Sequence, residues 1–584
     1  MKKHLLSIAI ALTAVTLTGC EDMLNTENYI GSNTGNFPSS IKDAEMMVTS
    51  IYSNLNHQYA KPMSSHFMTS EIASDDRFGG GILGDQNAID HLMMTNENQF
   101  GFSWELHYKG IYLANAAIEG LTSMSELATD KTRYDQLLGE SYFLRAFYYY
   151  ELATMFGSVP LLISTQQDSN SPRAEIDQLW ARIGSDLMQA INLMVNKKYN
   201  EYVVAGHATK WAAEALLARS FLFYTGFYQK NSMPLVEGSL SKQEVISHLE
   251  DCIAQSGHNL VGDYRNLWTY TNEHTVNDYA YTADATDKNG APLKWAGNDN
   301  IEEVFSIKFA NFCGYDYENQ EGYSNYNIPY FGFLGANGGE ETFPFGNGNG
   351  WGSVSPSLWD EWEQTEPTDI RRKASILRTT DEIKNWQPGG VTGLWEDTGF
   401  WQKKLMPVLS YDAYAKIGVW VNSIFWCAVE GFDVANNYGI ANWGAHFQNL
   451  MVIRFADVLL MHSELTSTAD GLNRVRQRAG LNPVGYSLEA LQRERRHELC
   501  FEGIRWNDIR RWHIAEQALS EQNGTPMNNV GRDVVMHDGK YSARYQATQG
   551  FFPLPIDQIN LSNGVLTQNE GWGSDAVFTT WNFE

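Results

Sequence analysis

Long amphipathic stretches constrain this chain more than any other feature of its sequence. In residues 136–156 apolar side chains recur every three or four positions, as at Leu137, Leu144 and Met155. Because an α-helix makes one turn in about 3.6 residues, this spacing places them on one face of a long helix. The same pattern predicts helices at residues 104–124, 176–194, 208–227, 242–254, 451–465 and 488–501. The chain is therefore predicted to be mainly α-helical.

The predicted helix at 208–227 mixes large and small residues on its apolar face, Trp211 with Ala212 and Ala215. Small residues let neighbouring helices approach closely, which favours antiparallel pairs. Several such pairs in succession are loosely similar to a tetratricopeptide array, although the repeats are irregular. We expect a tetratricopeptide-like scaffold of helix pairs.

The helical periodicity fades between about residues 257 and 450. Runs rich in Gly, Asn, Tyr and Trp take its place, such as 312–322 and 345–352. Such runs predict loops, with short strands at best. Because an irregular stretch of this length inside a compact protein is uncommon unless it carries function, ligand contacts are expected here first.

The N-terminus has the layout of a secretory signal. Lys2 and Lys3 precede an apolar stretch at 5–17, and Leu-Thr-Gly precedes Cys20. The apolar stretch is shorter than the roughly 20 residues that cross a bilayer. The run before Cys20 resembles a bacterial lipobox, in which cleavage leaves a cysteine that is then acylated. We expect residues 1–19 to be removed and Cys20 to be lipidated, with an ordinary cleaved signal as the alternative.

Composition excludes one class of partner. Asp and Glu number 69 against 42 Lys and Arg, a net charge of −27 that repels the phosphate backbone of nucleic acid. The 18 Trp, 29 Tyr and 28 Phe supply a large core instead. Cys252, Cys313, Cys427 and Cys500 are scattered without a C-x-x-C pair, so neither a zinc site nor a dithiol motif is indicated. We expect buried free thiols and no metal or cofactor.

Several motifs, in chain order, carry a family resemblance. Residues 454–464 and 472–481 are followed by a charged run at 494–512, which begins Glu-Arg-Arg-His-Glu-Leu. The tail from 553 to 572 and an earlier run at 141–148 complete the set. On these motifs the chain is identified as a member of the SusD/RagB family of surface lipoproteins.

This resemblance implies both a fold and a role. It implies about four tetratricopeptide-like helix pairs in residues 20–256, and a large, irregular, loop-rich C-terminal region with returning helices in 257–584. It also implies a lipid-anchored protein of the outer membrane, facing the extracellular side, that delivers captured glycan to a SusC-type TonB-dependent transporter. Glu21 and Asp22 fit the export signal of such lipoproteins. The RagB branch implies an oligopeptide as the alternative ligand.

Catalytic motifs are incomplete. A zinc-protease helix would need a second His four positions after the first, where Phe501 stands. Residues 79–84 satisfy the dinucleotide-binding pattern formally, but the run before them is too polar for a buried strand. Nothing in the sequence brings two distant carboxylates together as a glycosidase requires. We predict no enzyme, and we interpret the alternating charges of 495–511 as ion pairs of the scaffold.

A glycan presents an apolar C–H face to aromatic rings and a rim of hydroxyls to polar groups. The loop at 347–352 offers both chemistries. Glycines on either side of Trp351 are a poor setting for a core tryptophan, so we expect an exposed platform with Asn349 beside it. In the SusD family an Asn-Gly-Trp in this loop commonly supplies a glycan-stacking ring, and Asn349-Gly350-Trp351 matches it.

Two further sets of residues are candidates for this site. Three tyrosines precede the loop and could extend an aromatic arc, or could close the core instead. The segment at 74–81 places polar groups and a phenylalanine before three glycines, which would let its backbone approach a ligand. The expected ligand-binding residues are therefore Trp351, Asn349, Tyr326, Tyr323, Tyr330, Asp76, Arg77 and Phe78.

Overall fold

The computed structural model describes residues 37–60, 65–81, 89–93, 98–124, 130–201, 206–309, 324–332, 334, 342–383, 386, 393–428, 446–536 and 541–573. The long helices are α2 (Ile41–Ala60), α5 (Gly101–Ser123), α6 (Lys131–Phe156), α7 (Ile176–Leu193), α8 (Lys210–Phe227) and α9 (Lys242–Gln255). The C-terminal helices are α17 (Phe455–Thr466), α18 (Asp470–Arg478), α19 (Leu488–Leu499), α20 (Arg505–Arg511), α21 (Ala515–Ser520), α22 (Tyr541–Thr548) and α23 (Ile556–Leu561).

Shorter elements connect these helices. The short helices are α3 (His66–Ile72), α10 (Asn327–Phe331), α11 (Pro356–Thr365), α12 (Ile370–Ser375), α13 (Thr379–Glu382), α14 (Tyr411–Ile417) and α15 (Ser423–Ala428), with 3-10 turns at Tyr199–Glu201, Tyr264–Leu267 and Thr269–Thr271. The strands pair antiparallel as β1 (Ser232–Pro234) with β2 (Ser239–Ser241), β3 (Glu303–Ile307) with β6 (Leu450–Arg454), β4 (Ile376–Arg378) with β5 (Phe400–Gln402), and β7 (Pro526–Asn529) with β8 (Arg532–Val535).

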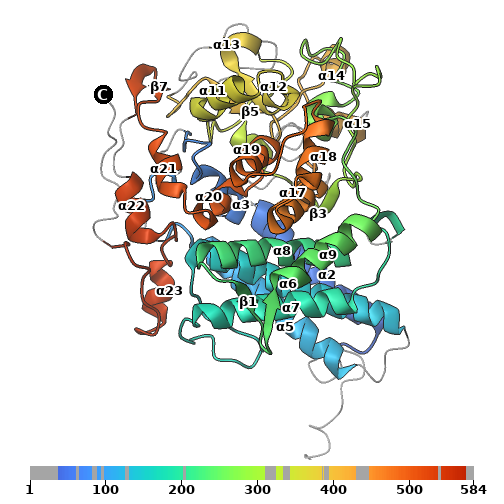
Figure 1. Cartoon of the computed structure of the whole chain (residues 1–584), viewed down its shortest axis with the longest axis vertical. Helices are drawn as coiled ribbons and strands as arrows, with labels where there is room; N and C mark the ends of the chain where they lie inside the picture. Colours follow the sequence, from blue (N-terminus) through green and yellow to red (C-terminus); the bar gives the residue numbers. More distant parts are fainter. Residues whose placement is uncertain are drawn as a thin grey trace, which may run out of the picture.

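The long helices pack side by side across the lower half of Figure 1. Helix α2 packs on α5, α6 on α7 and α8 on α9, while α17 and α18 form a further pair above them. Small residues permit this close packing. A Cβ atom added at Gly110 of α5 would lie 2.2 Å from the ring of Tyr148 in α6. The predicted mainly helical fold with tetratricopeptide-like pairs is confirmed.

Side-chain caps fix where the long helices begin. The Asp130 carboxylate accepts from the backbone N–H of Arg133 at the start of α6. Thr209 caps α8 in the same way, and Ser241 and Glu244 form a reciprocal capping box at the start of α9. Each cap satisfies N–H groups that have no partner within the helix.

Two sequence predictions need correction. The helix predicted at 451–465 begins only at Phe455, because Leu450–Arg454 forms β6 and pairs with β3. The middle region was predicted to hold loops with short strands at best, yet it also forms the short helices α10 to α15. Helix α11 shows why, since Pro356 opens it and Leu358, Trp359 and Trp362 bury one face.

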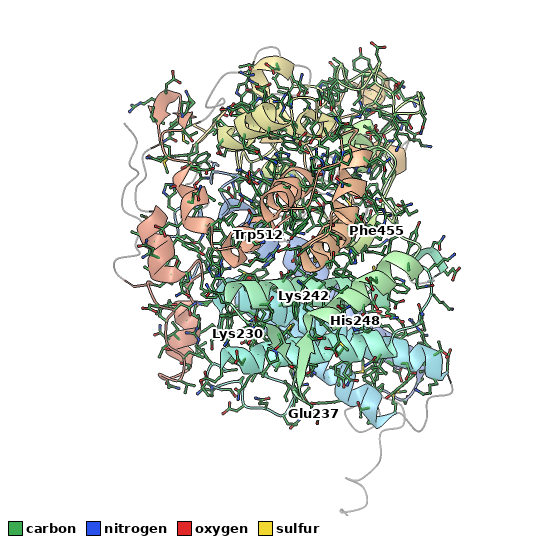
Figure 2. The ribbon with its side chains drawn as sticks, viewed as in Figure 1. Lys230, Glu237, Lys242, His248, Phe455 and Trp512 are labelled. Atoms are coloured by element: carbon green, nitrogen blue, oxygen red, sulfur yellow. The ribbon has the colours of Figure 1, made fainter. Side chains whose placement is uncertain are left out.

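The upper layer of Figure 1 holds α17 to α20, and α21 to α23 run down one side of the molecule. In Figure 2, Phe455 and Trp512 lie above the junction of the two layers, and Lys242 and His248 lie below it. An ion pair crosses this junction, with the Arg219 guanidinium of α8 lying 2.6 Å from the Asp457 carboxylate of α17.

The alternating charges of the C-terminal run form buried ion pairs, as predicted for a scaffold. Arg495 contacts the carboxylates of Asp457 at 2.7 Å and Asp508 at 2.8 Å. Glu498 is fully buried and accepts from Arg371 at 2.9 Å and Arg454 at 2.8 Å. These contacts join β6 and α12 to α19, so the run cross-links the upper layer.

Cys252 and Cys500 are buried free thiols, as predicted. Cys20, Cys313 and the side chain of Cys427 lie outside the described residues. Within the described part of the chain, no helix has both the length and the hydropathy needed to cross a membrane.

Candidate functional site

The loop containing Trp351 is held by backbone hydrogen bonds on two sides. On one side, the N–H groups of Asn349 and Trp351 donate to carbonyls of α10 at 2.8 and 3.0 Å. On the other side, Gly81 N–H donates to Gly350 O at 2.7 Å and Gly352 N–H donates to Gly79 O at 2.9 Å. Helix α10 and the 79–81 segment, which is distant in sequence, therefore both lie against this loop.

The glycines of these segments serve backbone packing. Gly80 has φ +68°, and a Cβ there would lie 2.5 Å from Gly350 O. From the sequence we expected the glycines to let a ligand approach the backbone. For Gly80 this expectation is wrong, because the backbone of residues 350–352 already lies against it.

The ring of Trp351 is packed inward, with a centroid 4.3 Å from the ring of Tyr330 and an interplanar angle of 49°. Only 7% of its surface is exposed, so the prediction of an exposed platform is wrong. Its glycine neighbours allow close packing of the loop, since a Cβ at Gly350 would lie 2.4 Å from Leu394 and one at Gly352 would lie 2.8 Å from the ring of Phe331. Tyr330 and Asn349 remain partly exposed, whereas Tyr326 is buried at the start of α10. Tyr323 lies outside the described residues.

Asp76, Arg77 and Phe78 are buried, which contradicts their assignment as ligand contacts. The Arg77 guanidinium donates to Glu71 at 2.6 Å and to the carbonyl of Gly352 at 2.7 Å. Asp76 pairs with Arg496 at 2.7 Å, and Phe78 is fully enclosed. Arg77 and Asp76 thus have partners inside the protein, although Nη2 of Arg77 and Oδ2 of Asp76 make no hydrogen bond to any residue that the structure describes. Through Arg77 and the carbonyl of Gly352, this segment supports the loop.

Ion pairs with Arg496 and Arg505 hold Asp75 and Asp76 in this buried position. Burial opposes ionisation of Asp75, yet the guanidinium groups of Arg505 and Arg496 outweigh it and lower its pKa to about 2. Burial raises the pKa of neighbouring Asp76 despite its contact with Arg496. The adjacent carboxylates thus belong to a fixed ion-pair cluster, and they are not a solvent-accessible acid pair.

Of the predicted residues, Tyr330 and Asn349 are partly exposed and lie beside the buried Trp351; we refer to these three as the aromatic site. An aromatic ring beside an amide can bind a ligand with an apolar face and a polar rim. A buried group of Asp90, His91 and Glu396 lies behind it, since Glu396 accepts from Gly80 N–H at 3.1 Å.

A groove of about 610 Å³ lies away from the aromatic site. Trp104, Tyr108 and Tyr112 of α5 line one wall, and Asn115 and Gln558 are among its polar residues. Tyr112 is 55% exposed. This groove was not predicted from the sequence, because apolar residues at helical spacing were interpreted as core packing. The signal that could have indicated it is the spacing of four residues between Trp104, Tyr108 and Tyr112, which places three aromatic rings on one face of α5.

A second hollow, of about 600 Å³, lies between α13 and the β7–β8 hairpin. Its lining includes Trp386, Asp397, Asn528 and Asp533. None of the sequence-predicted ligand residues that the structure describes lines either hollow.

Paired helices with an aromatic, amide-bearing groove along α5 define a helical-repeat protein. Comparison with family models is more specific. Residues 22–222 match the model described as "Starch-binding associating with outer membrane", and residues 302–572 match the SusD family model. The chain therefore belongs to the SusD/RagB family. The boundary expected between residues 256 and 257 stays a prediction.

Known proteins resemble the chain over nearly its whole length. It is 23% identical to a SusD-like protein of Formosa agariphila, covering 98% of this chain and all of that one. Its fold is similar to a laminarin-binding SusD-like protein, with a TM-score of 0.66, 22% identity, and coverage of 91% and 99% of the two chains. It is also similar to surface glycan-binding protein A from Bacteroides thetaiotaomicron in complex with laminarihexaose, with a TM-score of 0.65, 19% identity, and coverage of 91% and 99%. At this identity the structural likeness concerns the fold.

Proposed function

We propose that this protein is a non-catalytic, surface-exposed lipoprotein that binds oligo- or polysaccharide and delivers it to a SusC-type TonB-dependent transporter of the outer membrane. The observation that carries the proposal is the aromatic site, where the partly exposed Tyr330 ring packs on Trp351 beside Asn349. The printed descriptions of relatives that bind laminarin or laminarihexaose support a glycan as the ligand.

The chemistry of the aromatic site suits a sugar ring. The partly exposed Tyr330 can pack its ring on the C–H face of a pyranose, and the Asn349 amide can both donate to and accept from its hydroxyls. Trp351 then packs against the Tyr330 ring and fixes its orientation. This division of roles differs from the expected one, in which Trp351 itself was the platform.

Tyr330→Ala is expected to abolish retardation of the protein in gels that contain the polysaccharide it binds, identified first in a panel of known linkages. The loss in affinity should be at least about tenfold, or about 1.4 kcal/mol. Tyr112→Ala is the matched control, because it removes an exposed tyrosine from the helical groove. Both variants should keep a wild-type melting temperature to within a few degrees.

The opposite result for the two variants would place the glycan-binding site elsewhere on the protein. If Tyr112→Ala loses retardation while Tyr330→Ala migrates as the wild type does, glycan binds in the helical groove. If no polysaccharide binds but oligopeptides do, the peptide-binding alternative replaces the proposal. Trp351→Ala is a poorer test, because deleting a buried tryptophan costs about 3–5 kcal/mol of stability whatever the ligand does.

Cys20→Ser is expected to release the protein from the membrane fraction of its native host into the soluble fraction, since acyl chains on Cys20 would be its membrane attachment. Immunoblotting of separated fractions, with the wild type alongside, measures this. A variant that stays with the membrane would contradict the lipid anchor. Co-purification of a TonB-dependent barrel with the wild-type protein tests delivery, and its absence after mild detergent extraction would refute that partnership.

A further inference from the structure

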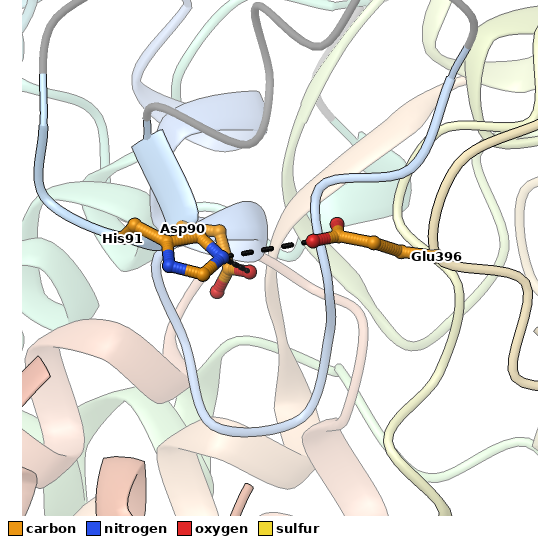
Figure 3. A group of neighbouring side chains, drawn as sticks. All are labelled: Asp90, His91 and Glu396. Carbon is orange, nitrogen blue, oxygen red and sulfur yellow. Dashed lines mark ion pairs between the residues drawn. The ribbon is translucent and has the colours of Figure 1, made fainter. Parts of the chain in front are cut away.

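A buried group of three metal-ligand side chains lies behind the aromatic site. Figure 3 shows Asp90 and His91 from one loop facing Glu396 from another, about 300 residues later in the chain. Asp90 and Glu396 are fully buried, and His91 is 5% exposed. One atom from each, an imidazole nitrogen and two carboxylate oxygens, lies within 4.8 Å of the others.

The spacing of these atoms suits a bound cation. His91 Nε2 lies 3.6 Å from Asp90 Oδ2 and 3.6 Å from Glu396 Oε1. These separations exceed the usual 2.7–3.2 Å of an N–H···O hydrogen bond. Around a tetrahedral metal with bonds of about 2.0–2.2 Å, neighbouring donor atoms lie about 3.4 Å apart. The two separations from His91 Nε2 are therefore close to those between neighbouring donors of such a metal.

The Glu396 carboxylate provides independent evidence. Its Oε2 accepts from Gly80 N–H at 3.1 Å, whereas its Oε1 faces His91 and is buried without a hydrogen-bond donor among the described residues. An unsatisfied buried carboxylate oxygen is costly, and buried polar groups of native proteins almost always have partners. A cation between Oε1 and the imidazole would satisfy it.

We propose that Asp90, His91 and Glu396 bind one divalent transition-metal ion, of the Zn²⁺ or Mn²⁺ class. One imidazole and two carboxylates form a mixed nitrogen and oxygen set, which suits these ions. Ca²⁺ is disfavoured, because it takes six to eight oxygen ligands and gains little from an imidazole. Sequence reasoning could not find this site, since nothing in the spacing connects residues 90 and 91 with residue 396.

The metal would cross-link the 89–93 loop to the segment that carries the aromatic site. Glu396 holds Gly80 through its second oxygen, and the carbonyl of Glu396 accepts from the Ser353 hydroxyl. Gly80 in turn bridges to Trp351. Leu92 and Glu396 both have positive φ, +50° and +54°, a strained conformation that needs support from its surroundings. The proposal concerns metal binding alone and holds whether or not the ligand is a glycan.

Titration calorimetry of chelator-treated protein, purified without a histidine tag, with Zn²⁺ and with Mn²⁺ tests the proposal. We expect one tight site per chain for at least one of these ions, and none of similar affinity for Ca²⁺. Glu396→Gln keeps the shape of the side chain but removes its charge, and should weaken binding at least tenfold. Asp90→Asn should do the same. His274→Gln is the matched control, because His274 pairs with a single, exposed carboxylate, that of Asp412.

Failure of both ions to bind at one site per chain would overturn the proposal, as would equal binding by the wild type and Glu396→Gln. In either case His91 is a histidine held between two carboxylates without a metal. If the variants do not fold, as judged by circular dichroism, anomalous diffraction at the zinc edge from zinc-soaked wild-type crystals decides. A peak between the three side chains supports the site, and its absence rejects it.

Discussion

Glu498→Ala is expected to lower the free energy of unfolding by at least about 3–5 kcal/mol, because it breaks a buried network and leaves charges without their partner. Glu498 contacts three guanidinium groups, those of Arg371, Arg454 and Arg478. Burial opposes its ionisation, but these cations outweigh burial and hold the pKa of Glu498 well below its usual range. Truncating it leaves three buried positive charges with one carboxylate fewer.

Urea unfolding followed by tryptophan fluorescence measures this effect. Glu489→Ala on the same helix is the matched control, since its side chain is 87% exposed and lies 4.0 Å from Arg493. Such a surface pair contributes little, so the control should change stability by less than about 0.5 kcal/mol. A loss below about 1 kcal/mol for Glu498→Ala would show that the network does not stabilise the upper layer.

From the pKa shifts of Asp457 and Glu214, stability is expected to be greatest near about pH 4 and to fall on both sides. On the acid side, the cations around Asp457 outweigh its burial and lower its pKa from 3.8 to about 2. A lowered folded-state pKa gives stability that is present above the unfolded-state pKa and is lost as the pH falls through 2. For Asp457 alone this is about 2 kcal/mol.

On the neutral side, burial raises the pKa of Glu214 from 4.5 to about 7, despite Lys210 and His248 nearby. The folded state then keeps a proton that the unfolded chain has released, so stability falls as the pH rises from about 4.5 to 7. The loss is about 3 kcal/mol. Glu214→Gln should flatten this limb of the melting temperature against pH, whereas Glu489→Gln should leave it unchanged. Parallel profiles for the wild type and Glu214→Gln would contradict the assignment.

The helical half of the fold could be predicted from the sequence because its signals are local. The periodic apolar residues of 176–194 define α7 to within one residue, and those of 136–156 define α6 except for its first five residues, 131–135. Local patterns did not predict the structure of segments that pair with residues distant in sequence. The apolar residues of Leu450–Arg454 continue the helical pattern of α17, but the segment forms a strand that pairs with β3. Short helices such as α12 also escaped, because six residues give no measurable period.

For the site, the exposure predicted for Trp351 is wrong, and ligand binding by its loop stays a prediction. Asn349 and Trp351 were recognised from a motif, yet burial depends on which backbone lies opposite, and that is the 79–81 segment. Arg77 looks like a ligand contact in sequence, but Glu71 and Gly352 O bind its guanidinium. Residue type and spacing therefore indicate the chemistry of a site, whereas tertiary contacts decide which atoms reach solvent.

The ion pairs of the upper layer also determine when the chain can fold. Asp75 binds Arg505, and the Glu71 carboxylate accepts from Gly503 N–H, across more than 400 residues of sequence. A chain still emerging from synthesis or export lacks these partners until its last fifth is present, so α3 and the segment after it would bury charges without compensation. Contacts this distant in sequence slow folding. The packing of α3 and the segment after it is thus completed only after the C-terminal run has been synthesised.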